Sequence, residues 1–147
     1  MTDKLVKNRR SANMSKIKSK DTKPELKVRK ALHRLGYRFR LHRKDITGRP
    51  DIVLPKYKAA IFVNGCFWHR HNGCREASKP KSNSEYWEAK LNKNVERDTR
   101  NYILLSERNR NVIVFWECEL DHSVELNTAL VKQRLIEKRL YQYETYC

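Results

Sequence analysis

Cysteine and histidine gather in one short stretch of this chain. Cys66, His71 and Cys74 lie close together in sequence, and Cys118 follows an apolar segment much later. In a reducing cytosol disulfides are rare, so such a cluster favours metal binding. Three thiolates and one imidazole make a closed tetrahedral zinc site with no open position for a catalytic water. We predict a structural zinc ion that braces a polar loop; the alternative is unliganded buried cysteines with a surface histidine.

His69 and Asp51 could carry catalysis. The spacing leaves His69 out of the zinc set, and an imidazole that titrates near neutrality suits a general base, although a loop histidine can also be a surface residue. Asp51 follows Gly48-Arg49-Pro50 and opens a strand, where a carboxylate can hold Mg²⁺ beside a phosphate. A Pro-Asp pair entering a strand indicates the restriction-endonuclease core, whose usual acid-x-Lys half is missing at Phe62–Gly65. A plain turn is the alternative for this pair.

Aromatic residues accompany these polar ones. Phe67 and Trp68 stand between a predicted zinc ligand and the predicted base, in a loop where they could wedge between base pairs. They could instead cover the zinc site or complete the core. Trp87 is equally ambiguous, whereas Trp116 lies in an apolar strand and is expected in the core.

The charge of the chain points to a polyanionic partner. Among 147 residues, 33 Lys and Arg stand against 17 Asp and Glu, which gives a net charge of +16 and a pI near 9.9. Nucleic acid is the usual partner of so basic a protein; a merely basic protein or one that docks on an acidic membrane is the alternative. No apolar run approaches the ~18 residues of a spanning helix, and no signal peptide is expected. We therefore expect a cytoplasmic protein of the nucleoid.

The elements that must position these residues form one domain. Residues 1–20 are expected to be a basic flexible arm, and 21–147 a single domain. Its first helix is capped by Thr22 with Glu25 in a capping box, and ends at Gly36. The expected apolar face of this helix consists of Leu26, Ala31, Leu32 and Leu35. Further elements are expected in the order strands at 37–41, 51–54 and 59–63, a loop at 64–83, a helix at 85–109 capped by Ser82 or Ser84, a strand at 111–116 and a helix at 125–140. This order predicts an α/β fold, a mixed sheet flanked by helices.

Four segments together resemble the very short patch repair (Vsr) DNA mismatch endonucleases of bacteria. They are Gly48–Asp51, Gly65–Cys74, Lys93–Asp98 and Trp116–Cys118, and the similarity runs from about Ser11 to Cys118. The resemblance implies a restriction-endonuclease-like fold of the PD-(D/E)xK type with a structural zinc site. It also implies an Mg²⁺-dependent nick in one strand, 5′ to the T of a T:G mismatch that arises when 5-methylcytosine deaminates.

The resemblance also implies roles for single residues. Asp51 would bind Mg²⁺ together with Val63, His69 would be the base, and Glu25 would orient water. The implied zinc ligands are Cys66, His71, Cys74 and Cys118; the inserting aromatics are Phe67, Trp68 and Trp87; expected phosphate contacts are Asn64 and Asn94. Two departures stand out: Asn64 replaces a second active-site His of a well-known member, and the spacing after His71 is one residue longer. Glu25 has a rival role as the capping-box acid.

Two other functions remain open at this point. One is a sequence-specific restriction-type endonuclease or nickase on the same core, and the other is a non-catalytic zinc-stabilised DNA-binding module. The expected partner is double-stranded DNA with a T:G mismatch, with mismatch-repair proteins and a repair polymerase as further candidates. We expect a monomer with no membrane partner.

Overall fold

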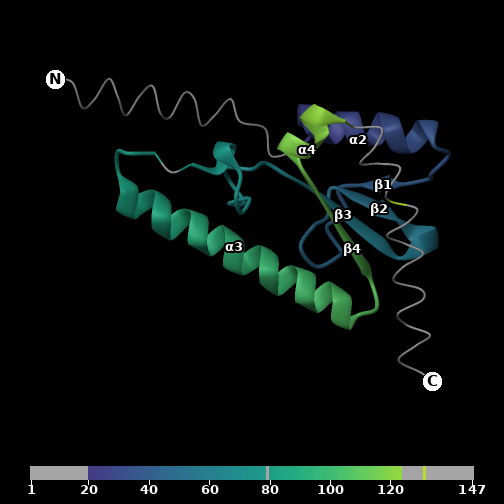
Figure 1. Ribbon diagram of the computed structural model, residues 1–147. Coiled ribbons are helices and arrows are strands. Elements are labelled where there is room, and N and C mark those ends of the chain that lie inside the picture. Colours follow the sequence, from purple (N-terminus) through teal and green to yellow (C-terminus); the bar gives the residue numbers. More distant parts are fainter. Residues whose placement is uncertain (1–19, 79, 124–130, 132–147) are drawn as a thin grey trace.

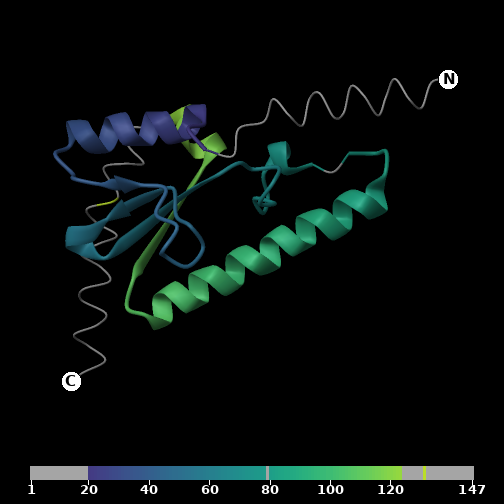
Figure 2. The ribbon, with the colours of Figure 1, turned by 180° about the vertical axis from the view of Figure 1, so that it is seen from behind.

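One four-stranded sheet lies between helices in the computed structural model, which describes residues 20–78, 80–123 and 131. Helices α2 and α4 cover one face of the sheet and α3 crosses the other, as Figure 1 and the reverse view in Figure 2 show. The expected arm at 1–20 and helix at 125–140 fall outside the described residues, apart from 20 and 131. Among the residues described, no helix is both long and apolar enough to cross a membrane.

Helix α2 (Lys23–Arg34) begins and ends where local signals predict. The Thr22 hydroxyl accepts a hydrogen bond from the Glu25 amide at 3.4 Å. Gly36 stands at φ +86°, a conformation that glycine adopts without strain. From there Gly36 and Tyr37 donate back to carbonyls of the last turn, each at 3.0 Å. The apolar face is partly different from the prediction: Leu26 and Leu35 are exposed, and the buried residues include Val28 instead.

The sheet mixes antiparallel and parallel pairs in the order β1-β2-β3-β4. Its strands are β1 (Arg40–Leu41), β2 (Ile52–Leu54), β3 (Ala59–Asn64) and β4 (Asn111–Trp116). The predicted hairpin is confirmed, because β2 and β3 pair antiparallel across the short 3₁₀ helix η1 (Pro55–Tyr57). Strands β3 and β4 pair in parallel and therefore need a long crossover. The loop after β3, with the 3₁₀ helix η2 (Arg75–Ala77), and α3 (Ser84–Glu107) provide it.

Both faces of the sheet are buried. Ile52, Leu54 and Ile61 pack with α2 and Leu120 of α4 in one cluster. Val53 and Phe62, which point the opposite way, pack with Leu105 of α3 in a second cluster. Successive strand residues face opposite sides, so continuous apolar runs are what a sheet covered on both faces requires.

Three boundaries differ from the sequence predictions. The first strand pairs only over β1, because Tyr37 and Phe39 pack against the core without joining the ladder. Helix α3 is preceded by Asn83 at φ +53° with no side-chain cap, so neither Ser82 nor Ser84 caps it; Asn tolerates this left-handed conformation. The short helix α4 (Glu117–His122) was not predicted, and it places Cys118 in its first turn.

Candidate active site and metal centre

A cleft of about 1430 Å³ brings the predicted catalytic residues together. Its walls come from the start of α2, the turn before β2, the end of β3 with the loop that follows, and the middle of α3. Three predicted catalytic residues line it: Glu25, Asp51 and His69. Three further predicted site residues line it as well: Val63, Asn64 and Trp68. Positions far apart in the sequence therefore face one volume large enough to admit part of a polymer.

Asp51 lies at the entry of β2 and is fixed by the next strand. Its Oδ2 accepts a hydrogen bond from the Val63 amide at 2.8 Å. Burial raises the pKa of Asp51 to about 6; the Val63 amide lowers it, and the neighbouring Glu25 carboxylate raises it. Two carboxylates that meet in a partly buried cleft disfavour each other's charge, and a hard cation between them relieves that cost. Val63 could contribute to such a site only through its backbone carbonyl.

Glu25 is a buried carboxylate, with only 2% of the residue exposed. Its Oε2 accepts hydrogen bonds from the Asp21 amide and from Arg29 Nη2, both at 3.0 Å. A strict capping box would pair this carboxylate with the amide of Thr22. The bond goes instead to the amide one residue earlier, so Glu25 stabilises the helix start and also lines the cleft.

His69 is oriented by Asp98, a residue with no predicted role. His69 Nδ1 and Asp98 Oδ2 are in close contact, and both side chains are largely buried. With Nδ1 donating to a carboxylate, Nε2 is the ring nitrogen that can accept a proton. One turn earlier on α3, Asn94 Nδ2 donates to the Trp68 carbonyl at 3.0 Å. The i, i+4 spacing of Asn94 and Asp98, which puts both on one helix face, is the sequence signal that could have revealed this clamp.

Asn64, at the end of β3, is 4% exposed. Its Nδ2 donates to the Tyr102 hydroxyl at 2.9 Å. Burial raises the pKa of Tyr102 to about 12, so this hydroxyl stays protonated at neutral pH. Asn64 and Asn94, the two predicted phosphate contacts, thus each donate one side-chain amide hydrogen to a partner within the protein. Their contact with phosphate stays a prediction.

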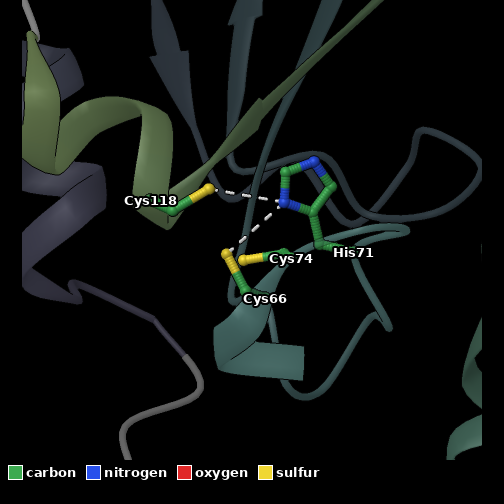
Figure 3. A group of neighbouring side chains, drawn as sticks. All are labelled: Cys66, His71, Cys74 and Cys118. Atoms are coloured by element: carbon green, nitrogen blue, oxygen red, sulfur yellow. Dashed lines mark hydrogen bonds between the residues drawn. The ribbon is translucent and has the colours of Figure 1, made fainter. Parts of the chain in front are cut away.

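The four predicted metal ligands converge on one another (Figure 3), and Gly65 and Glu117, next to Cys66 and Cys118 in sequence, line the cleft. Strand register explains why: Asn64 pairs with Trp116 in parallel strands, and Cys66 and Cys118 each follow that pair by two residues. His71 Nδ1 lies 3.7 Å from Cys66 Sγ and 3.4 Å from Cys118 Sγ. With Cys74, all four ligand atoms lie within 4.8 Å of one another.

The chemistry of this group fits a soft or borderline cation. Burial raises the pKa of Cys66 to about 12 and also raises that of Cys118. Neighbouring thiolates, of which Cys66 is buried and Cys74 and Cys118 are partly buried, are costly unless a cation neutralises them. Three sulfurs and one imidazole nitrogen form one of the ligand sets of tetrahedral structural zinc sites. Trp116, expected in the core, instead stacks on the His71 ring with centroids 4.2 Å apart and planes 7° apart.

The three predicted aromatics form one cluster. The ring centroid of Phe67 lies 5.2 Å from that of Trp68 and 5.4 Å from that of Trp87, and the two Trp rings are 5.9 Å apart. All three are half-buried, and they belong to neither core cluster of the described residues. Trp68 also lines the cleft. The cluster therefore borders the predicted catalytic residues and keeps part of its surface open.

Comparison with known proteins identifies the family. The model of the family described as "DNA mismatch endonuclease Vsr" matches residues 2–75. The chain belongs to this family. It is 50% identical to "Type II nicking enzyme V.XorIIP" of Xanthomonas oryzae over 88% of this chain and 95% of that protein. It is 47% identical to "Type II nicking enzyme V.NmeAIP" of Neisseria meningitidis over 92% of each chain. It is also 38% identical to "DNA mismatch endonuclease Vsr" of Escherichia coli over 93% of this chain and 87% of that protein.

Membership confirms the resemblance read from the motifs. The chain is a nuclease and hence a hydrolase. The described part of the fold, a mixed α/β sheet with a Cys/His group beside it, agrees with the coarse architecture predicted.

Proposed function

We propose that this chain is an Mg²⁺-dependent endonuclease that nicks one strand of double-stranded DNA 5′ to the T of a T:G mismatch. The observation that carries the proposal is that Glu25, Asp51 and the His69–Asp98 pair share one cleft, which the aromatic cluster borders through Trp68. An acid at the entry of a hairpin strand, in a mixed sheet between helices, supports a restriction-endonuclease-like fold. The names of the relatives, which include both mismatch endonuclease and nicking enzyme, support the substrate and the single-strand cut.

The acids of the cleft would hold the catalytic metal. Asp51 and the Val63 carbonyl are the proposed ligands, and Glu25 would orient a water molecule toward the phosphate. Bound Mg²⁺ would stabilise negative charge on the scissile phosphate and on the leaving 3′ oxygen.

His69 is the proposed general base. The Nδ1–H group would donate a hydrogen bond to Asp98, which leaves Nε2 free to take the proton of the attacking water. Asp98 also stabilises the imidazolium that results. No acid-x-Lys lysine is needed, because the imidazole performs the deprotonation.

The Cys66, His71, Cys74 and Cys118 group is proposed to hold a structural zinc ion. All four positions of a tetrahedral ion would be taken by protein, so this ion would not activate water. These four residues would then connect the loop that carries His69 to the first turn of α4, and this connection would hold the base in place relative to Asp51.

Recognition of the mismatched DNA is proposed to combine insertion of aromatic side chains into the base stack with attraction between basic residues and phosphates. Phe67, Trp68 and Trp87 would enter the base stack beside the wobble pair, which unstacks more easily than a matched pair. Cations at the cleft would contact phosphates without regard to sequence: Lys23, Arg49 and Arg97 line it. We propose that residues 1–20 form a flexible DNA-binding arm, that 21–147 are one domain, and that the protein acts as a monomer.

The cellular setting follows from the substrate. DNA that carries deaminated 5-methylcytosine implies the cytoplasm and, in a bacterium, the nucleoid. After the nick, mismatch-repair proteins and a repair polymerase would be needed to replace the wrong base.

A restriction-type enzyme that cuts an undamaged sequence is the second candidate, because it would use the same cleft. Substrate preference separates the two. The test is cleavage of duplexes that differ only at one pair, T:G, C:G or 5-methylcytosine:G, with each strand labelled separately. The proposal expects one nick, 5′ to the T of the T:G duplex. Equal cutting of the C:G duplex, or cuts in both strands, would favour the restriction enzyme; binding without any cut would favour a non-catalytic module.

A further inference from the structure

A second group of potential metal ligands lies at the start of α2. Ligand atoms of Asp21, Glu25 and His42 all lie within 4.8 Å of one another. This group already encloses a cation, because Arg29 Nη2 lies 2.7 Å from Asp21 Oδ1, 3.0 Å from Glu25 Oε2 and 3.0 Å from His42 Nε2. The guanidinium nitrogen fills the space that a metal ion would need.

The burial of the Arg29 guanidinium is unusual for a charged side chain. Its side chain is only 14% exposed, whereas a lysine on the same helix, Lys27, is 45% exposed. Burying a charge is costly unless it is paired and hydrogen-bonded. The Nε of Arg29 is buried without a hydrogen-bond partner among the described residues, so the side chain is held at its tip. The hydrogen bonds from Arg29 to Asp21 and Glu25 offset part of this cost.

The two acids that Arg29 holds also belong to the cleft wall. Asp21 and Glu25 line the cleft, and Arg29 does not. Glu25 stands close enough to Asp51 to raise the pKa of that carboxyl. Arg29 thus contacts two carboxylates, Asp21 and Glu25, in a cleft wall that a third carboxylate, Asp51, also lines. The negative charge that remains is what a divalent cation can neutralise.

We propose that Arg29 is a positioning residue of the nuclease centre: its guanidinium fixes the direction in which the Glu25 carboxylate faces Asp51 and offsets part of their repulsion. The proposal rests on the proposed roles of Asp51 and Glu25. A planar guanidinium can serve several acceptors from one fixed position, whereas a lysine ammonium is a compact point charge on a flexible stem. The contact of Arg29 with His42 also connects the segment after β1 to this guanidinium.

The first test does not depend on catalysis. The titration of the Asp51 carboxyl is followed by ¹³C NMR without added Mg²⁺ in wild type, Arg29→Met, Arg29→Lys and the control Lys27→Met. Lys27 pairs with Asp121 on the surface at 3.3 Å and does not line the cleft. In Arg29→Met the midpoint should move to higher pH, because the charge of Glu25 is no longer offset. It should return toward the wild-type value in Arg29→Lys and stay unchanged in Lys27→Met.

Other groups near Asp51 remain the same in all four proteins. They are Glu25 from α2, His42 from the segment after β1, the Val63 amide from β3 and Tyr102 from α3, with Arg49, Arg97 and Asp98 in the lining of the same cleft. A shift confined to Arg29→Met therefore reports the guanidinium. An unchanged midpoint in Arg29→Met, or an equal shift in Lys27→Met, would overturn the proposal.

The second test is the single-turnover nicking rate at saturating DNA. Arg29→Met should be slower by about ten- to a hundredfold, the scale expected when a reacting group is misplaced by about 1 Å, with DNA affinity unchanged. Arg29→Lys should lose several-fold, and wild-type rates in both variants would overturn the proposal. If Arg29→Met does not fold, Arg29→Lys alone decides by the same rate. A wild type that does not nick would refute the proposed function, and the NMR titration would still decide the role of Arg29.

Discussion

Replacing Asp51 by Asn should abolish nicking and at the same time stabilise the folded protein at neutral pH. The carboxyl pKa rises from 3.8 to about 6 in the folded protein, chiefly because of burial. The folded state therefore binds this proton more tightly than the unfolded state. The stability that the protonated carboxyl contributes is present at low pH and is lost as pH rises from about 4 to about 6. Above that range the ionised Asp51 destabilises the fold.

The magnitude follows from the size of the shift. About two pH units correspond to an upper limit of about 3 kcal/mol, and partial solvent exposure reduces this to about 1–2 kcal/mol. An Asn side chain carries no charge, and its Oδ1 can keep the hydrogen bond from the Val63 amide. Asp51→Asn should thus gain about 1–2 kcal/mol at pH 7.5 and progressively less toward pH 5.

The assay is urea unfolding across pH 5 to 7.5, without added Mg²⁺ and without chelator, so that the Cys/His group is undisturbed. Asp45→Asn is the control, because the side-chain hydrogen bond from Arg43 holds the pKa of Asp45 at about 2, and its loss should bring no gain. DNA binding by Asp51→Asn should remain, since phosphate contacts come from Lys and Arg. A variant less stable than wild type at pH 7.5, or a gain that does not vary with pH, would refute the reasoning.

The remaining predictions concern the base, the pH profile and the metal centre. His69→Ala should lower the nicking rate by about a hundredfold, with partial recovery at raised pH; an unchanged rate would remove His69 from the mechanism. Asp98→Asn should reduce the rate while DNA affinity stays the same, because the substitution weakens the acceptor that orients the His69 ring. For wild type at Mg²⁺ concentrations far below saturation, kcat/KM should fall about tenfold per pH unit below pH 6, because a proton on Asp51 competes with the metal, and a rate independent of pH between 5 and 7 would contradict the assignment. Cys118→Ser should lower both the zinc content, about one ion per chain in wild type, and the Tm; a zinc-free, fully active wild-type preparation would argue against the structural zinc.

The elements with local signals could be predicted from the sequence. Helix α2 has a capping hydroxyl at Thr22 and a left-handed glycine at Gly36, and both act within a few residues of chain. The exposed Leu26 and the buried Val28 could not be assigned in this way, because the sheet determines which side of the helix is covered. The same limit applies to β1, where packing of Phe39 replaces backbone pairing.

The site residues also fall into those that local sequence signals predict and those that tertiary packing determines. Spacing alone predicted the Cys66–Cys74 part of the metal centre, and Cys118 joins it through the parallel register of β3 and β4. Arg29 carries no local signal. The i, i+4 spacing of Asn94 and Asp98 shows only that both lie on one helix face, because their roles depend on which helix faces pack against the loop and the cleft. Residue chemistry predicted roles for Asp51 and His69, the family resemblance implied the same roles, and the geometry adds the partners that orient them.

The central claim is that this cleft cuts DNA next to a T:G pair that the aromatic cluster detects. The most direct measurement is the single-turnover nicking rate on T:G and C:G duplexes at one fixed salt concentration, for wild type and for Phe67→Ala/Trp68→Ala. Wild type should strongly prefer the T:G duplex. The double variant should lose most of that preference and keep its non-specific affinity, which rests on phosphates. Equal rates on the two duplexes in wild type, or a full preference kept by the double variant, would contradict the account.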